Sequence, residues 1–141
     1  MGLLKCREGY TLVDAAFLLL LIGIVLGTTA PLSQRMIAKY QLNSAAQVLS
    51  ADLAEAKVRA IQSNAVAKVI RESIRDYRVA GAPRQLPGMV EFDVSSADSM
   101  SFNGLGAITA GTSQRFVLVN RYGDSREIRI YAAGGLEVKR L

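Results

Sequence analysis

The chain has 141 residues, a net charge of +5, half of its residues hydrophobic, no histidine and one cysteine. This length suits one domain with a modest core, and without histidine no Ser-His-Asp or Cys-His nucleophile can be assembled. A single cysteine closes no intrachain disulfide and cannot supply the usual zinc ligand sets, so covalent or zinc-based stabilisation is excluded.

An uncharged run over residues 15–34 holds most of the hydrophobicity, and its first part, from Ala15 to Leu26, is almost purely aliphatic. A helix of about 20 residues reaches ~30 Å, which is the thickness of the hydrocarbon core of a bilayer. A short polar head carrying Lys5 and Arg7 precedes the run, and no secretory-type cleavage site follows it. We therefore expect a membrane helix rather than a freely soluble enzyme, with an uncleaved signal anchor as the plain alternative.

Asp14 lies at the start of this apolar run, where an unpaired carboxylate costs a few kcal/mol. If the chain were cut between Gly9 and Tyr10, the new α-amine of Tyr10 would be a cation that can pair with Asp14 of the same chain or of a neighbour. The alternative is a carboxylate that simply reaches the lipid head groups.

The residues Gly9-Tyr10-Thr11-Leu12-Val13-Asp14, followed by the aliphatic stretch and Pro31, resemble the class III signal of type IV pilins and type II secretion pseudopilins. The resemblance implies cleavage after Gly9 by a prepilin peptidase, methylation of the Tyr10 amine, and packing of the helix into a filament. The family normally has Glu where this chain has Asp14, which is one methylene shorter and has less reach toward a neighbour's amine.

Two further features of the apolar run are relevant to assembly. Gly23 and Gly27 form a Gly-x-x-x-Gly pair that either lets a second helix come close or adds flexibility beside the proline. Pro31 lacks an N–H and crowds the carbonyl of Gly27, so we expect a bend there. We assign Asp14, Gly23, Gly27 and Pro31 to assembly.

Beyond the run, apolar residues recur at spacings of three and four, which predicts one continuous amphipathic stripe: Leu42, Ala46, Leu49, Leu53, Ala56 and Ala60. We expect one helix from about Thr11 to about Ser63, with Asn64 as its terminator. The predicted divisions are a leader over 1–9, a transmembrane or filament-core helix over 10–34, an amphipathic helix over 35–64 and a periplasmic β-domain over 65–141.

After Asn64 the pattern changes to short β-branched and aromatic segments between turn residues. The predicted strands are Val66–Arg71, Asp76–Val79, Met89–Val94, Ser99–Phe102, Arg115–Asn120, Glu127–Ala132 and Leu136–Arg140. A hairpin about Tyr122-Gly123-Asp124 is expected to pair the fifth and sixth of them. The fold class is α+β: a long N-terminal helix, transmembrane and then amphipathic, packed on a small antiparallel β-meander. In order and length the chain is similar to the GspH/FimT group of minor pseudopilins.

Basic residues are frequent between Lys57 and Arg84 and at the end of the chain. Such a patch binds DNA phosphates or anionic lipid heads, or else is a solvated surface with local ion pairs. The candidate nucleic-acid contacts are Arg71, Arg75, Arg78, Lys139 and Arg140. FimT-like pilins that bind DNA carry a Gly-Arg-x-Arg element near the last strand, and the matching stretch 135–138 has neither arginine, so DNA ranks low among the partners.

No residue set supports catalysis, a cofactor or a metal. Gly104-x-Gly106 is isolated and opens no helix, and Asp93, Asp98 and Asp124 lack the dense spacing of calcium ligands. We predict a structural minor pilin or pseudopilin, anchored once in the bacterial inner membrane and then built into a type II secretion pseudopilus or a type IV pilus. Its expected partners are other pilins or pseudopilins, the prepilin peptidase, the inner-membrane assembly platform and, before assembly, lipid. A DNA-binding minor pilin in DNA uptake is the alternative.

Overall fold

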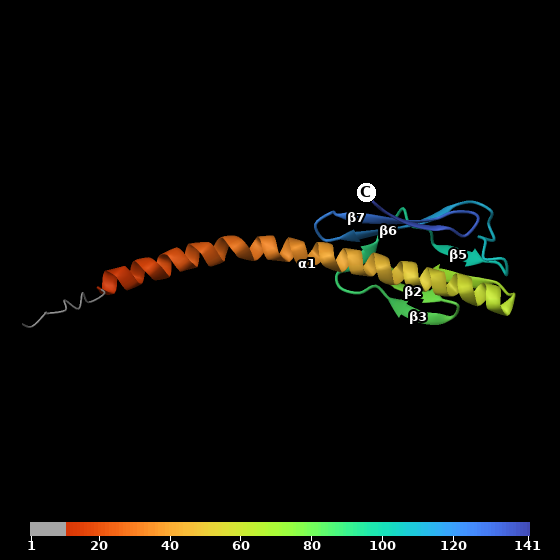
Figure 1. Cartoon of the computed structure of the whole chain (residues 1–141), viewed down its shortest axis with the longest axis horizontal. Helices are drawn as coiled ribbons and strands as arrows, with labels where there is room; N and C mark the ends of the chain where they lie inside the picture. Colours follow the sequence, from red (N-terminus) through yellow and green to blue (C-terminus); the bar gives the residue numbers. More distant parts are fainter. Residues whose placement is uncertain (1–10) are drawn as a thin grey trace, which may run out of the picture. The chain divides into compact units, whose positions relative to one another are not determined.

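The computed structural model describes residues 11–141, with the side chains of 28–32 outside the description. The chain divides into two compact units, Met1–Arg35 and Met36–Leu141. One helix, α1 (Leu12–Ser63), contributes to both (Figure 1). The predicted helix bounds are therefore confirmed to within one residue.

Asn64 ends α1, as the sequence predicted. Its φ is +48°, and the N–H groups of Asn64 and Ala65 donate to the carbonyls of Ile61 and Ala60. This pair of reversed hydrogen bonds is a Schellman cap, in which asparagine takes the left-handed position usually filled by glycine.

Eight strands follow the helix and form two antiparallel four-stranded sheets. Sheet A has the order β3-β2-β1-β5, and sheet B has the order β4-β6-β7-β8. The strands are β1 (Ala67–Arg71), β2 (Asp76–Val79), β3 (Ala82–Gln85), β4 (Val90–Phe92), β5 (Ser99–Phe102), β6 (Gln114–Asn120), β7 (Ser125–Ile130) and β8 (Leu136–Arg140).

The predicted α+β class, a long helix packed on antiparallel sheet, is confirmed. The strands do not form one meander, however, because β4 joins sheet B before β5 returns to sheet A. The sequence analysis also missed β3, which lies between the predicted strands Asp76–Val79 and Met89–Val94. Ala80 and Gly81 form the loop before it with φ of +47° and +90°, the geometry of a tight type I′ hairpin. Pro83 is tolerated because β3 is an edge strand, where no ladder hydrogen bond is lost.

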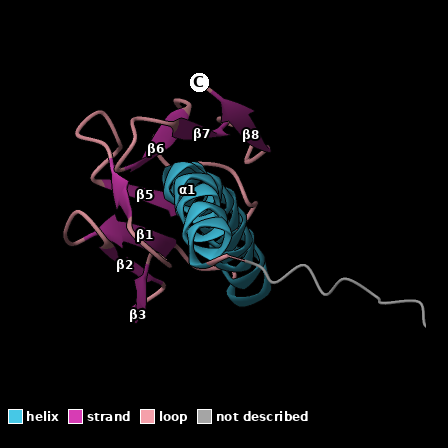
Figure 2. Ribbon diagram, turned by 90° about the vertical axis from the view of Figure 1, so that its left-hand side faces the viewer, coloured by secondary structure: helices cyan, strands magenta, loops and turns pink. Residues whose placement is uncertain are grey.

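The core lies between α1 and the inner faces of both sheets, which flank the helix in Figure 2. All six residues of the predicted stripe are at most 2% exposed, so that prediction is confirmed. The predicted hairpin is confirmed as well, since Phe116 of β6 lies opposite Ile128 of β7 and both are buried. Tyr77, Phe92 and Phe116 form an aromatic row, with ring centroids 5.8 and 5.9 Å apart.

Candidate functional site

The first turn of α1 is closed by a reciprocal cap. The Thr11 hydroxyl and backbone N–H donate to Asp14 Oδ2 at 2.8 and 3.2 Å, and the Asp14 N–H donates back to Thr11 Oγ1 at 3.4 Å. This is a capping box with aspartate in the place usual for glutamate, at the positive end of the helix dipole. Asp14 thus has partners within its own first turn. Gly9 and Tyr10 lie outside the described residues, so the cleavage site and the pairing of Asp14 with the Tyr10 amine stay predictions.

The apolar start of α1 is an exposed surface. Its large side chains are between 44% exposed, at Leu21, and 87% exposed, at Leu12. A Cβ built on Gly23 or Gly27 would meet no atom within 4 Å, so both glycines lie on open parts of the helix surface. Exposed apolar surface this continuous is typical of contact with lipid or with another protein.

Within residues 11–141, the undescribed side chains left aside, no helix has a stretch long and apolar enough to cross a membrane. The backbone of α1 continues through position 31, and the side chain of Pro31 lies outside the description. The predicted bend at Pro31 therefore stays a prediction.

The three predicted arginines in and beside sheet A all have partners: Arg71 lies on β1, Arg78 on β2, and Arg75 in the loop between them. Arg71 pairs with Asp98, and Arg78 Nη2 lies 2.8 Å from Glu72 Oε1. Arg75 donates from Nη2 to the carbonyl oxygen of Gly88, while its buried Nε has no hydrogen-bond partner among the described residues. This arrangement matches the alternative of a surface with local ion pairs.

Lys139 and Arg140, the other two predicted contacts, lie on β8 at the edge of sheet B. The candidate nucleic-acid residues thus lie on two different sheets and, in the case of Arg75, in a loop beside sheet A. Arg140 lies opposite Arg126 of β7, a juxtaposition that the sequence could not reveal because it depends on strand register.

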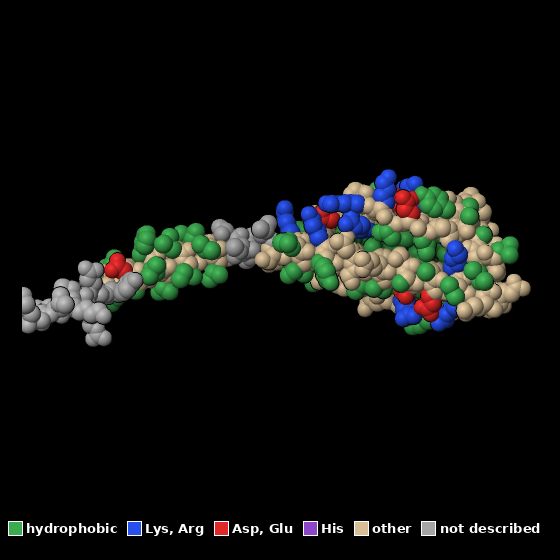
Figure 3. Space-filling view, viewed as in Figure 1, with side chains coloured by type: hydrophobic (Ala, Val, Ile, Leu, Met, Phe, Trp, Pro, Cys, Tyr) green, Lys and Arg blue, Asp and Glu red, His purple; other side chains and the backbone are tan. Residues whose placement is uncertain are grey.

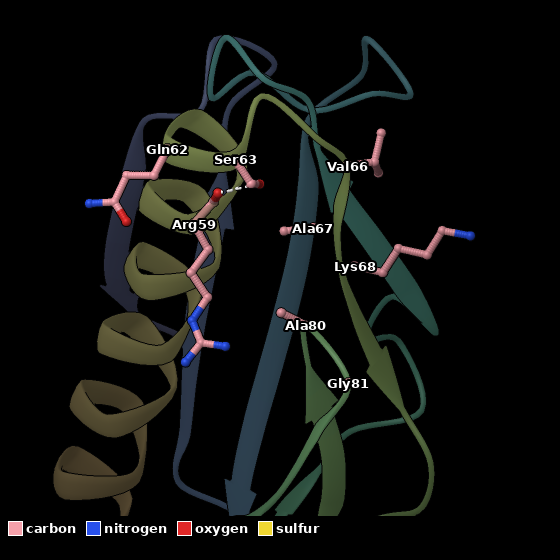
Figure 4. A pocket seen from close by; sticks show the side chains of 8 residues that line it. All are labelled: Arg59, Gln62, Ser63, Val66, Ala67, Lys68, Ala80 and Gly81. Carbon is pink, nitrogen blue, oxygen red and sulfur yellow. Dashed lines mark hydrogen bonds between the residues drawn. The ribbon is translucent and has the colours of Figure 1, made fainter.

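A surface groove of about 640 Å³ lies between the last turns of α1 and sheet A (Figure 4). Small residues dominate one wall, and the groove is lined by Arg59, Gln62, Ser63, Val66, Ala67, Lys68, Ala80 and Gly81. Arg59 pairs with Glu55 at 2.7 Å, and the Ser63 hydroxyl donates to the Arg59 carbonyl, so neither offers a reactive group. Lys68 points away from the helix in Figure 4. The arrangement is suited to contact and carries no nucleophile with an adjacent base.

Asp52 and Tyr77 form a buried polar pair that sequence reasoning missed. Asp52 is not one of the apolar residues of the predicted stripe, yet it is only 9% exposed, and the Tyr77 hydroxyl donates to its Oδ2 at 2.5 Å. Burial, and then this hydrogen bond, raise the pKa of the Tyr77 hydroxyl above its ordinary value. The helical spacing does indicate this burial: Asp52 follows Leu49 by three residues and precedes Ala56 by four, which puts it on the buried face of α1.

The three aspartates weighed as calcium ligands lie apart, in different interactions. Asp98 pairs with Arg71, Asp124 lies 3.8 Å from Lys39, and Asp93 accepts a hydrogen bond from the Ser95 N–H at 2.9 Å. Hydrogen bonds from Ser95 lower the pKa of the Asp93 carboxyl. Among the described residues, no three acidic or sulfur ligands gather where they could hold a metal ion.

The fold is that of a pilin's globular domain with its amphipathic helix. The solved type IV minor pilin FimU of Pseudomonas aeruginosa PAO1 matches with a TM-score of 0.62 and 16% identity, over 72% of this chain and 90% of that one. A second crystal form of FimU gives a TM-score of 0.60 and 16% identity, over 70% and 92%. No family model and no curated protein matches the sequence. At 16% identity, this structural similarity establishes the fold alone.

Proposed function

We propose that this chain is a structural pilin subunit of the minor type, assembled into a filament through the apolar start of α1. The observation that carries the proposal is the combination of an exposed aliphatic helix with a domain of minor-pilin fold. A helix that is apolar all round is stable only when lipid or other helices surround it. The amphipathic part of the same helix is already covered by the two sheets, so the exposed part is the surface left for assembly.

In this proposal, cleavage between Gly9 and Tyr10 by a prepilin peptidase frees an α-amine, which is methylated. Asp14 then has two roles in sequence. In the single subunit its carboxylate caps the first turn through Thr11. In the filament it accepts the amine of a neighbouring subunit, which fixes the axial position of one helix against the next.

Before assembly the segment 10–34 holds the subunit in the bacterial inner membrane, with the β-domain in the periplasm. Moving the helix from lipid into a helical bundle exchanges one apolar surrounding for another, so its net cost is small. Gly23 and Gly27 offer open helix surface at which a second helix can approach closely. The assembly platform would guide this exchange in a type IV pilus or a type II secretion pseudopilus.

The experiment that tests the proposal is mass spectrometry of the native chain recovered from membranes and from sheared filaments. We expect a chain that begins at methylated Tyr10, and an uncleaved chain for the variant Gly9→Val. The matched control Gly2→Val changes a glycine within the leader but away from the cut, and it should be processed normally. Recovery of the intact leader in every fraction would refute the proposal in favour of a signal anchor.

DNA uptake is the weaker candidate, because Arg71 and Arg78 are occupied by carboxylates that DNA phosphates would have to displace. We therefore treat DNA as a competitor to be tested.

A further inference from the structure

A basic cleft of about 270 Å³ lies within the second unit, between the first turns of its part of α1 and the open end of sheet B. Lys39 and Asn43 come from the helix, and Arg126 and Arg140 come from β7 and β8. Figure 3 shows Lys and Arg side chains gathered where this unit begins. We propose that this basic cleft binds the phosphate head group of an anionic phospholipid, an inference that rests on the proposed membrane anchoring.

The protein balances only part of the positive charge in the basic cleft, which is also lined by Asp124. Arg126 and Arg140 lie directly opposite each other on neighbouring strands, where like charges destabilise the sheet. The only carboxylate that ion-pairs with any of the three cations in the described part of the chain is Asp124, 3.8 Å from Lys39. The next acidic side chain along β7, Glu127, accepts two hydrogen bonds from Arg129 on the other face of the strand. A bound anion would remove the repulsion between the two arginines.

The donors of the basic cleft suit a phosphate. Asn43 Oδ1 accepts from Arg126 Nε at 2.9 Å, which fixes the guanidinium and leaves its terminal nitrogens for a ligand. Two guanidinium groups and one ammonium group provide the planar forks and the point charge with which proteins bind phosphate oxygens. The Lys39 side chain is 53% exposed, so a ligand can approach from solvent.

The place of the basic cleft in the chain favours a lipid over a free anion. Lys39 follows the proposed membrane segment by five residues, which is ~7.5 Å of helix, and the head-group layer on each side of a bilayer is about 5–8 Å thick. A side chain this close to the membrane meets lipid phosphates at far higher local concentration than phosphate in solution.

The test uses the full ¹⁵N-labelled chain in neutral detergent micelles, titrated with dihexanoyl phosphatidylglycerol. NMR follows the side-chain Nε–Hε signals of Arg126 and Arg140. We expect both signals to shift saturably, and dihexanoyl phosphatidylcholine and inorganic phosphate to bind at least tenfold more weakly. The variant R126Q/R140Q should lose at least tenfold in affinity. The matched control K68Q/R115Q removes two exposed charges elsewhere and should change affinity less than twofold.

Each other outcome overturns the assignment. Equal binding of inorganic phosphate would mean a free-anion site, and tighter binding of a 12-base-pair duplex would mean a nucleic-acid site. Equal losses in both double variants would mean that only the overall charge acts. If R126Q/R140Q fails to fold, R140Q alone decides the matter, because the Arg140 side chain makes no hydrogen bond in the described chain. The N-terminal mass is read separately, so a chain that starts at Tyr10 but ignores phosphatidylglycerol would refute this inference and leave the proposed function standing.

Discussion

Tyr77→Phe isolates the energy of the buried polar contact between helix and sheet. The substitution removes only the hydroxyl that donates to Asp52 and keeps the ring, which packs edge-on against Phe92 at an interplanar angle of 86°. Asp52 would then keep a buried carboxylate without this donor. A hydrogen bond to a charged group contributes about 1.5–3 kcal/mol net, and the orphaned carboxylate adds its desolvation, so we expect a loss of about 2–3 kcal/mol.

The assay is urea denaturation of the full chain in neutral detergent, followed by circular dichroism. A double-mutant cycle with Asp52→Asn, which keeps an acceptor and removes the charge, should give a coupling energy of about 1–2 kcal/mol between positions 52 and 77. The midpoint should fall while the slope with urea stays the same. A loss below about 0.5 kcal/mol for Tyr77→Phe, or strictly additive effects of the two substitutions, would refute the reasoning.

Three other predictions follow from the same structure. The folded state holds the Tyr77 hydroxyl proton more tightly than the unfolded state does. The free energy of unfolding should therefore be constant below about pH 10 and fall above it by up to ~1.4 kcal/mol per pH unit. Tyr77→Phe should lack this part of the alkaline slope in urea titrations at a series of pH values. Gly134→Ala should lower the free energy of unfolding by roughly 3 kcal/mol, because φ is +80° and the new Cβ would collide with the carbonyl oxygen of Gly106. The control Gly111→Ala, at φ +68° with open space around it, should lower it by about 1–2 kcal/mol. Equal losses in urea denaturation would refute the clash. Asp14→Ala should weaken the first turn of α1 by about 0.5–1 kcal/mol, seen as faster amide exchange at residues 14 and 15, and unchanged exchange would show that the cap contributes nothing.

The helix could be predicted from sequence almost to the residue, because its signals are local. Thr11 and Asn64 provide the start and stop chemistry, and the spacing of three and four from Leu42 to Ala60 defines the buried face. The hairpin between β6 and β7 was equally accessible, since alternating apolar residues surround a tight turn at Gly123.

The sheets were less predictable, because strand order is a non-local property. No local pattern indicates that β4 joins sheet B while β5 pairs with β1. The hairpin before β3 was hidden because Ala80 adopts a positive φ that the sequence rules reserve for Gly, Asn or Asp. The basic cleft could not be predicted either, because it is non-local too: Lys39 and Arg140 line the same cleft only once the helix and sheet B have packed together.

The helix α1 combines two kinds of apolar surface, and the difference has a physical meaning. From Leu12 to Leu26 large apolar side chains point in every direction, whereas beyond Met36 the buried residues form one face. A one-sided stripe is fully covered by the chain's own sheets, so the second unit can complete its core without a partner. The sheets cannot cover the all-round apolar surface in the same way, because their inner faces already pack against the amphipathic part of α1. Such a surface is stable when lipid or other helices cover it, and in the proposed function the same segment serves first as the anchor and then as the contact between subunits.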